Sequence, residues 1–269
     1  MIVPALARLN RLRIWRHKVR IGQDCLRATS FDRLVYLWYW RCRKSHHAET
    51  AFLRSCLKPG MQVIDAGANL GVYSHFFARC VGSQGRVAAF EPDPVLFESL
   101  RANAASNGLA QIEPYRLALG ASSGRGRLSL DPFNAGDNHL TASDGRTKPG
   151  LEVDITTIDE FLGGAPMEFI KIDVQGWEPH VLRGMRQTLD RNPQLQLYLE
   201  FSPYALDRSG NSPAELFTWL TDRDFEFTIL RDGNPAPASL DMPALASRRL
   251  WFANVYARRK AKDRELPAR

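Results

Sequence analysis

From Lys58 onward, short β-rich runs alternate with helical segments, which is the pattern of a parallel sheet covered by helices. Seven strands are predicted, at residues 62–66, 86–91, 112–119, 169–174, 196–201, 225–230 and 250–256. The helices predicted between them span residues 70–80, 94–106, 178–189 and 213–221. Only a Gly/Pro-rich stretch separates the last two strands, so we expect them to pair antiparallel. The sequence therefore predicts an α/β fold with a mostly parallel sheet.

Charge is distributed unevenly along the 269 residues. The net charge is +7, but residues 1–58 carry +10 and residues 248–269 carry +6, which leaves −9 for residues 59–247. A core that binds polyanions is therefore not expected. Arginines interrupt the N-terminal segment where a signal peptide has its apolar core, and no apolar run reaches the roughly 18 residues of a membrane span. We expect a cytoplasmic protein.

The two ends of the chain are predicted to flank one main domain. Residues 1–49 are predicted to form a basic helical extension, residues 50–257 the domain and residues 258–269 a basic tail. Phe31, Leu34, Val35 and Trp38 recur at helical spacing, so we expect part of the extension to pack against the domain on the side where a substrate binds. Contact of the extension with an anionic membrane stays an alternative. Residues 120–150 predict a short hairpin and a mobile loop near the site.

The segment VIDAGANLGVYS at residues 63–74 runs from a buried strand through a glycine-rich turn into a helix. Gly67 and Gly71 allow a ligand to approach the backbone, and Asn69 tolerates a left-handed conformation. Twenty residues beyond Gly71 the next strand ends at Glu91, where a carboxylate in such folds lies beside a ribose diol. These features predict a nucleoside-binding half. Pro92 and Ala118, at the ends of the second and third predicted strands, complete the candidate cofactor residues.

The pattern D-x-G-x-N-x-G at residues 65–71 differs from the G-x-G-x-x-G of dinucleotide-binding proteins. Asp65 would repel a pyrophosphate, whereas it suits the cationic aminoacyl end of S-adenosylmethionine, in direct or water-mediated contact. An NAD-dependent oxidoreductase shares the first two motifs and stays a weaker alternative.

Four segments of this chain, residues 63–74, 90–94, 170–185 and 199–203, resemble the successive motifs of the FkbM family of S-adenosylmethionine-dependent methyltransferases. The most specific is IKIDVQGWE at residues 170–178, in which Gln175 stands where the family commonly has Glu. That replacement puts a catalytic role for position 175 in doubt. The resemblance implies a class I methyltransferase fold, Rossmann-like, with seven strands and an antiparallel strand at the C-terminal end. It also implies O-methylation of a sugar, a glycan or a secondary metabolite.

Lys171 and Asp173 point to one face of their strand, and Asp173 lies at its carboxyl end, where ligands bind in open α/β sheets. A carboxylate there could orient an acceptor hydroxyl or take its proton, and a structural ion pair between the two residues is the alternative. His139, in the polar loop, is a further candidate base. Glu200, which ends the fifth strand, is expected to line the acceptor pocket. No ligand spacing predicts a metal site.

These observations predict an S-adenosylmethionine-dependent methyltransferase that acts on a small-molecule or glycan hydroxyl. A non-catalytic nucleoside-binding protein whose basic ends bind RNA or anionic membrane stays open, although no RNA-binding motif supports it.

Overall fold

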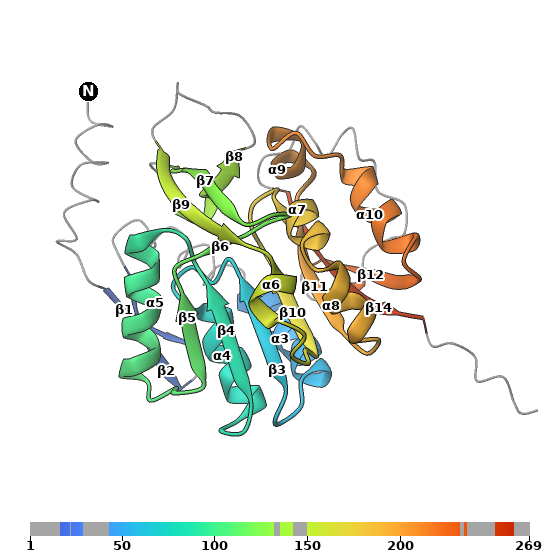
Figure 1. Cartoon of the computed structure of the whole chain (residues 1–269). Coiled ribbons are helices and arrows are strands. Elements are labelled where there is room, and N and C mark those ends of the chain that lie inside the picture. The colour runs from blue at the N-terminus through green and yellow to red at the C-terminus, as the bar shows by residue number, and fades with distance from the viewer. Residues whose placement is uncertain are drawn as a thin grey trace, which may run out of the picture.

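The computed structural model describes residues 17–21, 23–28, 43–131, 135–141, 150–231, 234–235 and 251–260. Its centre is one mixed sheet with the strand order β13-β12-β14-β11-β10-β3-β4-β5 (Figure 1). The strands of this sheet are β3 (Gln62–Ala66), β4 (Arg86–Phe90), β5 (Ile112–Tyr115), β10 (Phe169–Ile172), β11 (Gln196–Phe201), β12 (Phe225–Arg231), β13 (Asn234–Pro235) and β14 (Ala253–Arg259).

The predicted parallel arrangement is confirmed for β5, β4, β3, β10 and β11, and β14 runs antiparallel to both of its neighbours. The last described strand does not lie at the sheet edge, since it inserts between β11 and β12. Within the described residues the sheet has eight strands rather than the predicted seven, because the two-residue β13 adds to its edge. The strand predicted at 112–119 is also wrong in extent, because its end forms β6 (Ala118–Leu119) of a second sheet.

Helices cover both faces of the main sheet because successive residues of its buried strands point to opposite sides. On one face, residues such as Val63 and Val87 pack with α3 (Arg43–Cys56), α4 (Val72–Val81) and α5 (Pro94–Ser106). On the other face, residues such as Ile64 and Ile170 pack with the remaining helices. These helices are α6 (Ile158–Leu162), α7 (Glu178–Arg183), α8 (Arg186–Arg191), α9 (Pro203–Arg208) and α10 (Pro213–Thr221).

The helix predicted at 178–189 is two helices, α7 and α8, interrupted at Gly184. A Cβ atom at Gly184 would lie 2.0 Å from the carbonyl oxygen of Gly120, so this position packs directly against another backbone. The interruption therefore reflects a close approach that only tertiary packing creates.

A second sheet has the strand order β6, β9 (Gly150–Thr156), β7 (Gly124–Ser129) and β8 (His139–Thr141), and a short helix η1 (Ala135–Asp137) precedes β8. The predicted hairpin is confirmed, because β7 and β8 pair antiparallel. The segments 132–134 and 142–149, where a loop was expected, lie outside the described residues.

The prediction that residues 1–49 are helical is wrong for residues 17–28, which form an antiparallel hairpin of β1 (His17–Ile21) and β2 (Asp24–Ala28). Along β2, buried Asp24 and Leu26 alternate with the more exposed Cys25 and Arg27, which is the two-residue period of a strand. Helix α3 is helical as expected and runs across the expected domain boundary at residue 49. The aromatic series at 31–38 lies outside the described residues.

Polar contacts join the hairpin to the domain. The side chain of Asn107 accepts a hydrogen bond from the backbone of Cys25 and donates one back, at 2.9 and 3.1 Å. Asn103 makes the same pair of contacts with Arg27, at 2.8 and 3.2 Å. An ion pair of 2.7 Å joins Asp24 to Arg79 of α4. Part of the extension therefore packs on the domain, against α4 and α5, and the expectation that it covers the side where a substrate binds stays a prediction.

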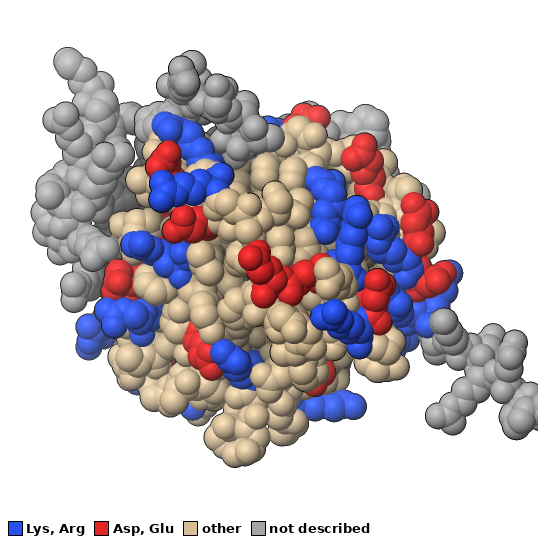
Figure 2. Space-filling view, in the orientation of Figure 1, with Lys and Arg blue, Asp and Glu red and all other residues tan. Residues whose placement is uncertain are grey.

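The described surface carries both signs of charge on the face drawn in Figure 2, where basic and acidic side chains are interspersed. In the part of the chain that the structure describes, no helix has the length and apolarity to cross a bilayer.

Candidate functional site

Four parallel strands end side by side, and the turns that follow them carry most of the predicted site residues. Ile172 at the end of β10 is in register with Ala66 of β3, and Ala66 is in register with Phe90 of β4. The turns that begin at residues 67, 91 and 173 consequently lie at one edge of the sheet, together with the end of β11. This carboxyl edge is where open α/β sheets bind ligands.

The turn after β3 has a left-handed backbone at Gly67, Asn69 and Gly71, with φ of 78°, 52° and 92°. A Cβ atom at Gly67 would lie 1.9 Å from the backbone oxygen of Asp173, so only glycine allows the two turns to approach. The backbone amide of Gly67 also donates to the carbonyl oxygen of Phe90 at 3.0 Å. The expected glycine-rich turn is thus a tightly held connection between three strands.

Glu91 fixes the relation between the first two turns. One carboxylate oxygen accepts from the backbone amide of Asn69 and the other from that of Asp93, each at 2.9 Å. Burial raises the pKa of Glu91 to about 8, against the lowering effect of these hydrogen bonds. Each carboxylate oxygen has a second lone pair for a further donor, so the expected ribose contact stays a prediction.

The remaining candidate cofactor residues, Pro92 and Ala118, lie in different surroundings. Pro92 is partly exposed directly after Glu91. Ala118 is buried and pairs with Ile155 in the small sheet. The small sheet reaches this edge through Asn138, whose side-chain amide donates to the carboxylate of Asp93 at 3.0 Å.

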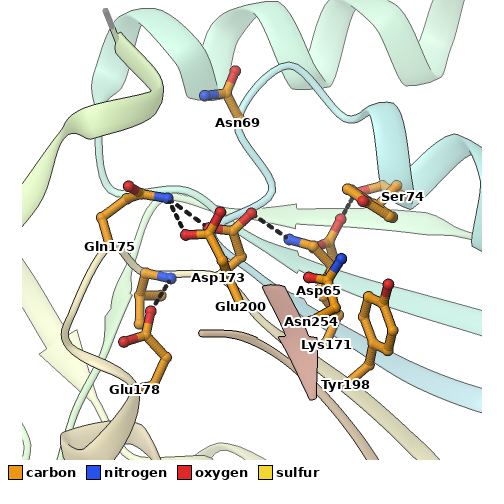
Figure 3. A network of polar contacts seen from close by, with 12 residues as sticks. Asp65, Asn69, Ser74, Lys171, Asp173, Gln175, Glu178, Tyr198, Glu200 and Asn254 are labelled. Atoms are coloured by element: carbon orange, nitrogen blue, oxygen red, sulfur yellow. Dashed lines mark hydrogen bonds and ion pairs between the residues drawn. The ribbon is translucent and has the colours of Figure 1, made fainter. Parts of the chain in front are cut away.

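Lys171 lies buried between two aspartates (Figure 3). Its ammonium nitrogen is 3.2 Å from Asp65 and 3.4 Å from Asp173, and it lies 4.7 Å from the centre of the Tyr73 ring. Burial lowers the pKa of Lys171, but the two carboxylates outweigh it and raise that pKa above its ordinary value. Lys171 therefore stays charged, and the structural ion pair of the alternative interpretation is present and includes Asp65 as well.

Asp65 has no exposed surface in this network. Its second oxygen accepts a hydrogen bond of 2.6 Å from the hydroxyl of Ser74 at the start of α4. In this arrangement Asp65 contacts Ser74 and Lys171, and its expected contact with a cationic ligand stays a prediction. Asp173 differs, because 27% of its side chain is exposed at the carboxyl edge.

Gln175, whose catalytic role the replacement of Glu puts in doubt, lies between the carboxylates of Asp173 and Glu200. Its side-chain nitrogen donates to Asp173 at 2.8 Å and to Glu200 at 2.7 Å (Figure 3). Glu200 is placed at the carboxyl edge as expected. Burial, followed by the negative charge of Asp173, raises the pKa of Glu200 well above its ordinary value. The edge therefore carries both an ionic and a hydrogen-bonded carboxylate network.

Sequence reasoning missed Glu49 of α3. One of its oxygens accepts hydrogen bonds from the hydroxyls of Tyr73 and Tyr198, both at 2.6 Å, and from the side chain of Asn254 at 3.2 Å. Burial raises the pKa of Glu49 above its ordinary value. The sequence does mark Glu49, as a single acid in the otherwise uncharged run AETAFL at residues 48–53. Its hydrogen-bond partners could not be found from the sequence, because they lie up to 205 residues away.

His139 is not in the main sheet with Lys171 and Asp173. It lies on β8 of the small sheet, where its Nδ1 is 2.9 Å from the backbone oxygen of Asp137. Its role as a base stays a prediction. Within the described ranges, no three His, Cys, Asp or Glu side chains are grouped so as to hold a metal ion.

Comparisons with known proteins agree with this arrangement. A model of the methyltransferase FkbM domain matches residues 65–227. Methyltransferase 1 of Beauveria bassiana is 26% identical over 144 residues, which cover 46% of this chain and 57% of that protein. The hexuronic acid methyltransferase AglP of Haloferax volcanii is 30% identical over 178 residues, which cover 63% of this chain and 70% of that protein.

The fold also has a solved counterpart. A Clostridium thermocellum protein assigned as an rRNA methylase superposes with a TM-score of 0.50 at 11% identity, covering 81% of this chain and 98% of that one. The expected class I methyltransferase fold is thereby confirmed. S-adenosylmethionine, the expected cofactor, is consistent with the fold and with the matched domain. Since the matched domain includes the glycine-rich turn, the Lys171–Asp173 strand and Glu200, this chain belongs to the FkbM family of methyltransferases.

Proposed function

We propose that this protein transfers a methyl group from S-adenosylmethionine to a hydroxyl of a sugar, a glycan or a secondary metabolite. The observation that carries the proposal is the position of Asp173. Within the Lys171 ion-pair cluster, Asp65 is fully buried, whereas Asp173 keeps exposed surface at the carboxyl edge. An acceptor that enters at this edge therefore meets the carboxyl group of Asp173, held in place by a buried cation.

The residues at the edge suit the chemistry of this cofactor. Bound S-adenosylmethionine supplies an activated methyl group on a sulfonium. The ribose of the cofactor carries two hydroxyls, which match the carboxylate of Glu91, and the left-handed turn after β3 brings backbone close to the ligand. The cofactor residues we propose are Asp65, Gly67, Asn69, Gly71, Glu91, Pro92 and Ala118.

Asp173 has two roles in this proposal. Its carboxylate accepts a hydrogen bond from the acceptor hydroxyl, which aligns the oxygen for an in-line displacement, and it takes the hydroxyl proton as the new bond forms. Lys171, with one contact to Asp173 and one to Asp65, fixes the position of the carboxylate. A hydroxyl acceptor needs such a proton acceptor, whereas a carboxylate acceptor would not.

Binding and transfer are tested separately. S-adenosylhomocysteine should raise the melting temperature, and NAD and RNA should not. Asp173→Asn should keep affinity for S-adenosylhomocysteine within a few-fold and lower methyl transfer by about 10²-fold or more. Asp207→Asn, at an exposed position on α9, is the matched control and should change neither.

The acceptor can be identified by mass spectrometry of metabolites and glycans from cells with and without the gene, as the compound that loses one methyl group. Radiolabelled S-adenosylmethionine then measures transfer to that compound. Stabilisation by NAD instead of S-adenosylhomocysteine would reject the proposal, as would full transfer by the Asp173→Asn variant.

A further inference from the structure

At the carboxyl edge, the carboxylates of Asp173 and Glu200 both accept a hydrogen bond from the side-chain nitrogen of Gln175. The side-chain nitrogen of Gln175 is 2.8 Å from Oδ1 of Asp173 and 2.7 Å from Oε2 of Glu200 (Figure 3). Asp173 follows β10 and Glu200 lies near the end of β11, the neighbouring strand. The two carboxylate oxygens are therefore within two hydrogen-bond lengths of each other.

The backbone around Gln175 is built to aim this side chain. Gln175 has a left-handed φ of 56°. The carboxylate of Glu178 accepts hydrogen bonds from the amides of Val174 and Gly176, both at 3.1 Å. On the other side, the side chain of Asn211 donates to the carbonyl oxygen of Gly176 at 3.0 Å. The turn is thus held from α7 and from the segment after α9, and Gln175 is fixed between them.

The charges that face this pair are mostly negative. Lys171 is the one cation among the described residues of the network, and it is shared between Asp173 and buried Asp65. Glu178 adds a carboxyl group from α7, and Glu49 of α3 lies further along the same network. A single ammonium group cannot balance Asp65, Asp173 and Glu200 together. Two carboxyl groups in one site then take up protons as a coupled pair, because the first charge opposes the second.

We propose that Asp173 and Glu200 hold one proton between them at neutral pH, and that Gln175 is the positioning residue that keeps them together. Glu200 carries the proton, since the ammonium group of Lys171 lies 3.4 Å from Asp173, whose side chain also keeps exposed surface. The raised pKa of Glu200, caused by burial and then by Asp173 and Glu178, agrees with this assignment. The amide of Gln175 can donate one hydrogen to each partner, which the Glu common in the family at this position could not do.

The use of this pair in catalysis rests on the proposed function. In that reaction the O–H bond of the acceptor breaks and its proton passes to Asp173. The acceptor oxygen forms its bond to the methyl carbon while the sulfur–carbon bond breaks, and the sulfur keeps that electron pair. The carboxyl pair then holds two protons and returns one to solvent through the exposed part of Asp173. An anionic carboxylate acceptor is disfavoured at such a pair, because Lys171 is already bound to two aspartates.

The pair is tested without cofactor or acceptor, by ¹³C NMR titration of protein labelled at its Asp and Glu carboxyl carbons. Asp173→Asn and Glu200→Gln assign the two signals. We expect two well-separated steps, one below the ordinary range of a carboxyl group or within it and one near neutral pH or above. Two independent titrations near the ordinary value would overturn the shared proton.

Two substitutions test the role of Gln175. Gln175→Leu removes the hydrogen-bond donor without adding charge. It should shift the upper titration step of the carboxyl pair to higher pH, because the ionised forms lose their hydrogen bonds. Gln175→Glu adds a third carboxyl group and should raise the upper step further, by about one pH unit or more. Gln187→Glu adds the same charge at an exposed position on α8 and should leave both steps unchanged. A purely structural Gln175 would change the melting temperature and not the titration, which would overturn its positioning role.

This experiment separates the two proposals. An intact shared proton in a protein that transfers no methyl group would reject the proposed function and keep the pair. Independent titration in a protein that does transfer methyl groups would reject the pair alone.

Discussion

Lys171→Met removes one buried charge and keeps most of the length of an unbranched, apolar side chain. Lys171 is 3% exposed and its partner Asp65 is 0% exposed, at a distance of 3.2 Å. After the substitution Asp65 keeps its hydrogen bond to Ser74 but has no cation in contact. We expect the loss of stability to come from this stranded carboxylate and not from a cavity.

Two independent arguments give the same size for the loss of folding free energy in Lys171→Met. Breaking a buried ion pair by removing one partner typically costs about 3 to 5 kcal/mol. The stranded carboxylate can instead bind a proton, and neutralising a carboxyl group of reference pKa about 3.9 at pH 7 costs about 4 kcal/mol. For a domain of this size the loss corresponds to a decrease of roughly 6 to 20 °C in melting temperature.

The assay is urea unfolding at pH 5, 6 and 7 on the wild type, Lys171→Met, Lys171→Met/Asp65→Asn and the exposed control Lys58→Met. The protonation route predicts that the penalty of Lys171→Met shrinks by about 1.4 kcal/mol for each pH unit below 7. The double variant should recover most of the loss, because no fully buried charge is then stranded and Asp173, the other partner of Lys171, keeps contact with water. Lys58→Met should stay within about 0.5 kcal/mol of the wild type.

A Lys171→Met variant within about 1 kcal/mol of the wild type at pH 7 would refute this reasoning. So would a penalty that does not depend on pH, since it would indicate lost packing and not a stranded charge.

Three further substitutions test other parts of the structure. Gly67→Ala should destabilise the fold by at least about 2 kcal/mol more than Gly82→Ala in thermal unfolding, because both have positive φ but only the first Cβ would meet backbone, at 1.9 Å. An equal loss of stability in the two variants would mean that the positive φ alone causes the strain, and not the contact of the new Cβ atom with backbone. Burial raises the pKa of Glu178 from 4.5 to about 7, so the folded state binds an extra proton between these values and wild-type stability falls as pH rises through them. Glu178→Gln should flatten this part of the curve in urea unfolding, and an unchanged slope would contradict it. Asn107→Ala should cost about 1 to 2 kcal/mol and speed hydrogen exchange at the amide of Cys25, which loses its acceptor. Unchanged exchange would show that the hairpin does not depend on this contact.

Prediction from the sequence succeeded where a feature depends on neighbours along the chain. The strand at 62–66 and the helices at 94–106 and 213–221 are observed at the predicted bounds. Prolines at the helix starts explain the last two, because proline suits the first helical turn. Asp173 and Glu91 could be placed at the carboxyl edge because each is the last or the penultimate residue of a predicted strand.

Prediction failed where distant segments decide the outcome. The basic segment at 17–28 forms a hairpin, although the extension was expected to be helical, and Asn103 and Asn107 of α5 satisfy its backbone. The predicted helix at 178–189 breaks at Gly184, where the backbone at Gly120 approaches. Neither contact has a signal in the local sequence.

The sequence by itself determined that a parallel sheet forms and that its carboxyl edge carries acids and a glycine-rich turn. The physical reason is that strand periodicity, turn conformation and the order of strand and turn are properties of short stretches of chain. Only the tertiary structure decided which of those acids share a cation and which share an amide. Lys171 and Asp65 are 106 residues apart, and Gln175 and Glu200 are 25 apart. Their pairing, and with it the protonation of each carboxyl group, depends on distances and burial that exist only after the strands have packed.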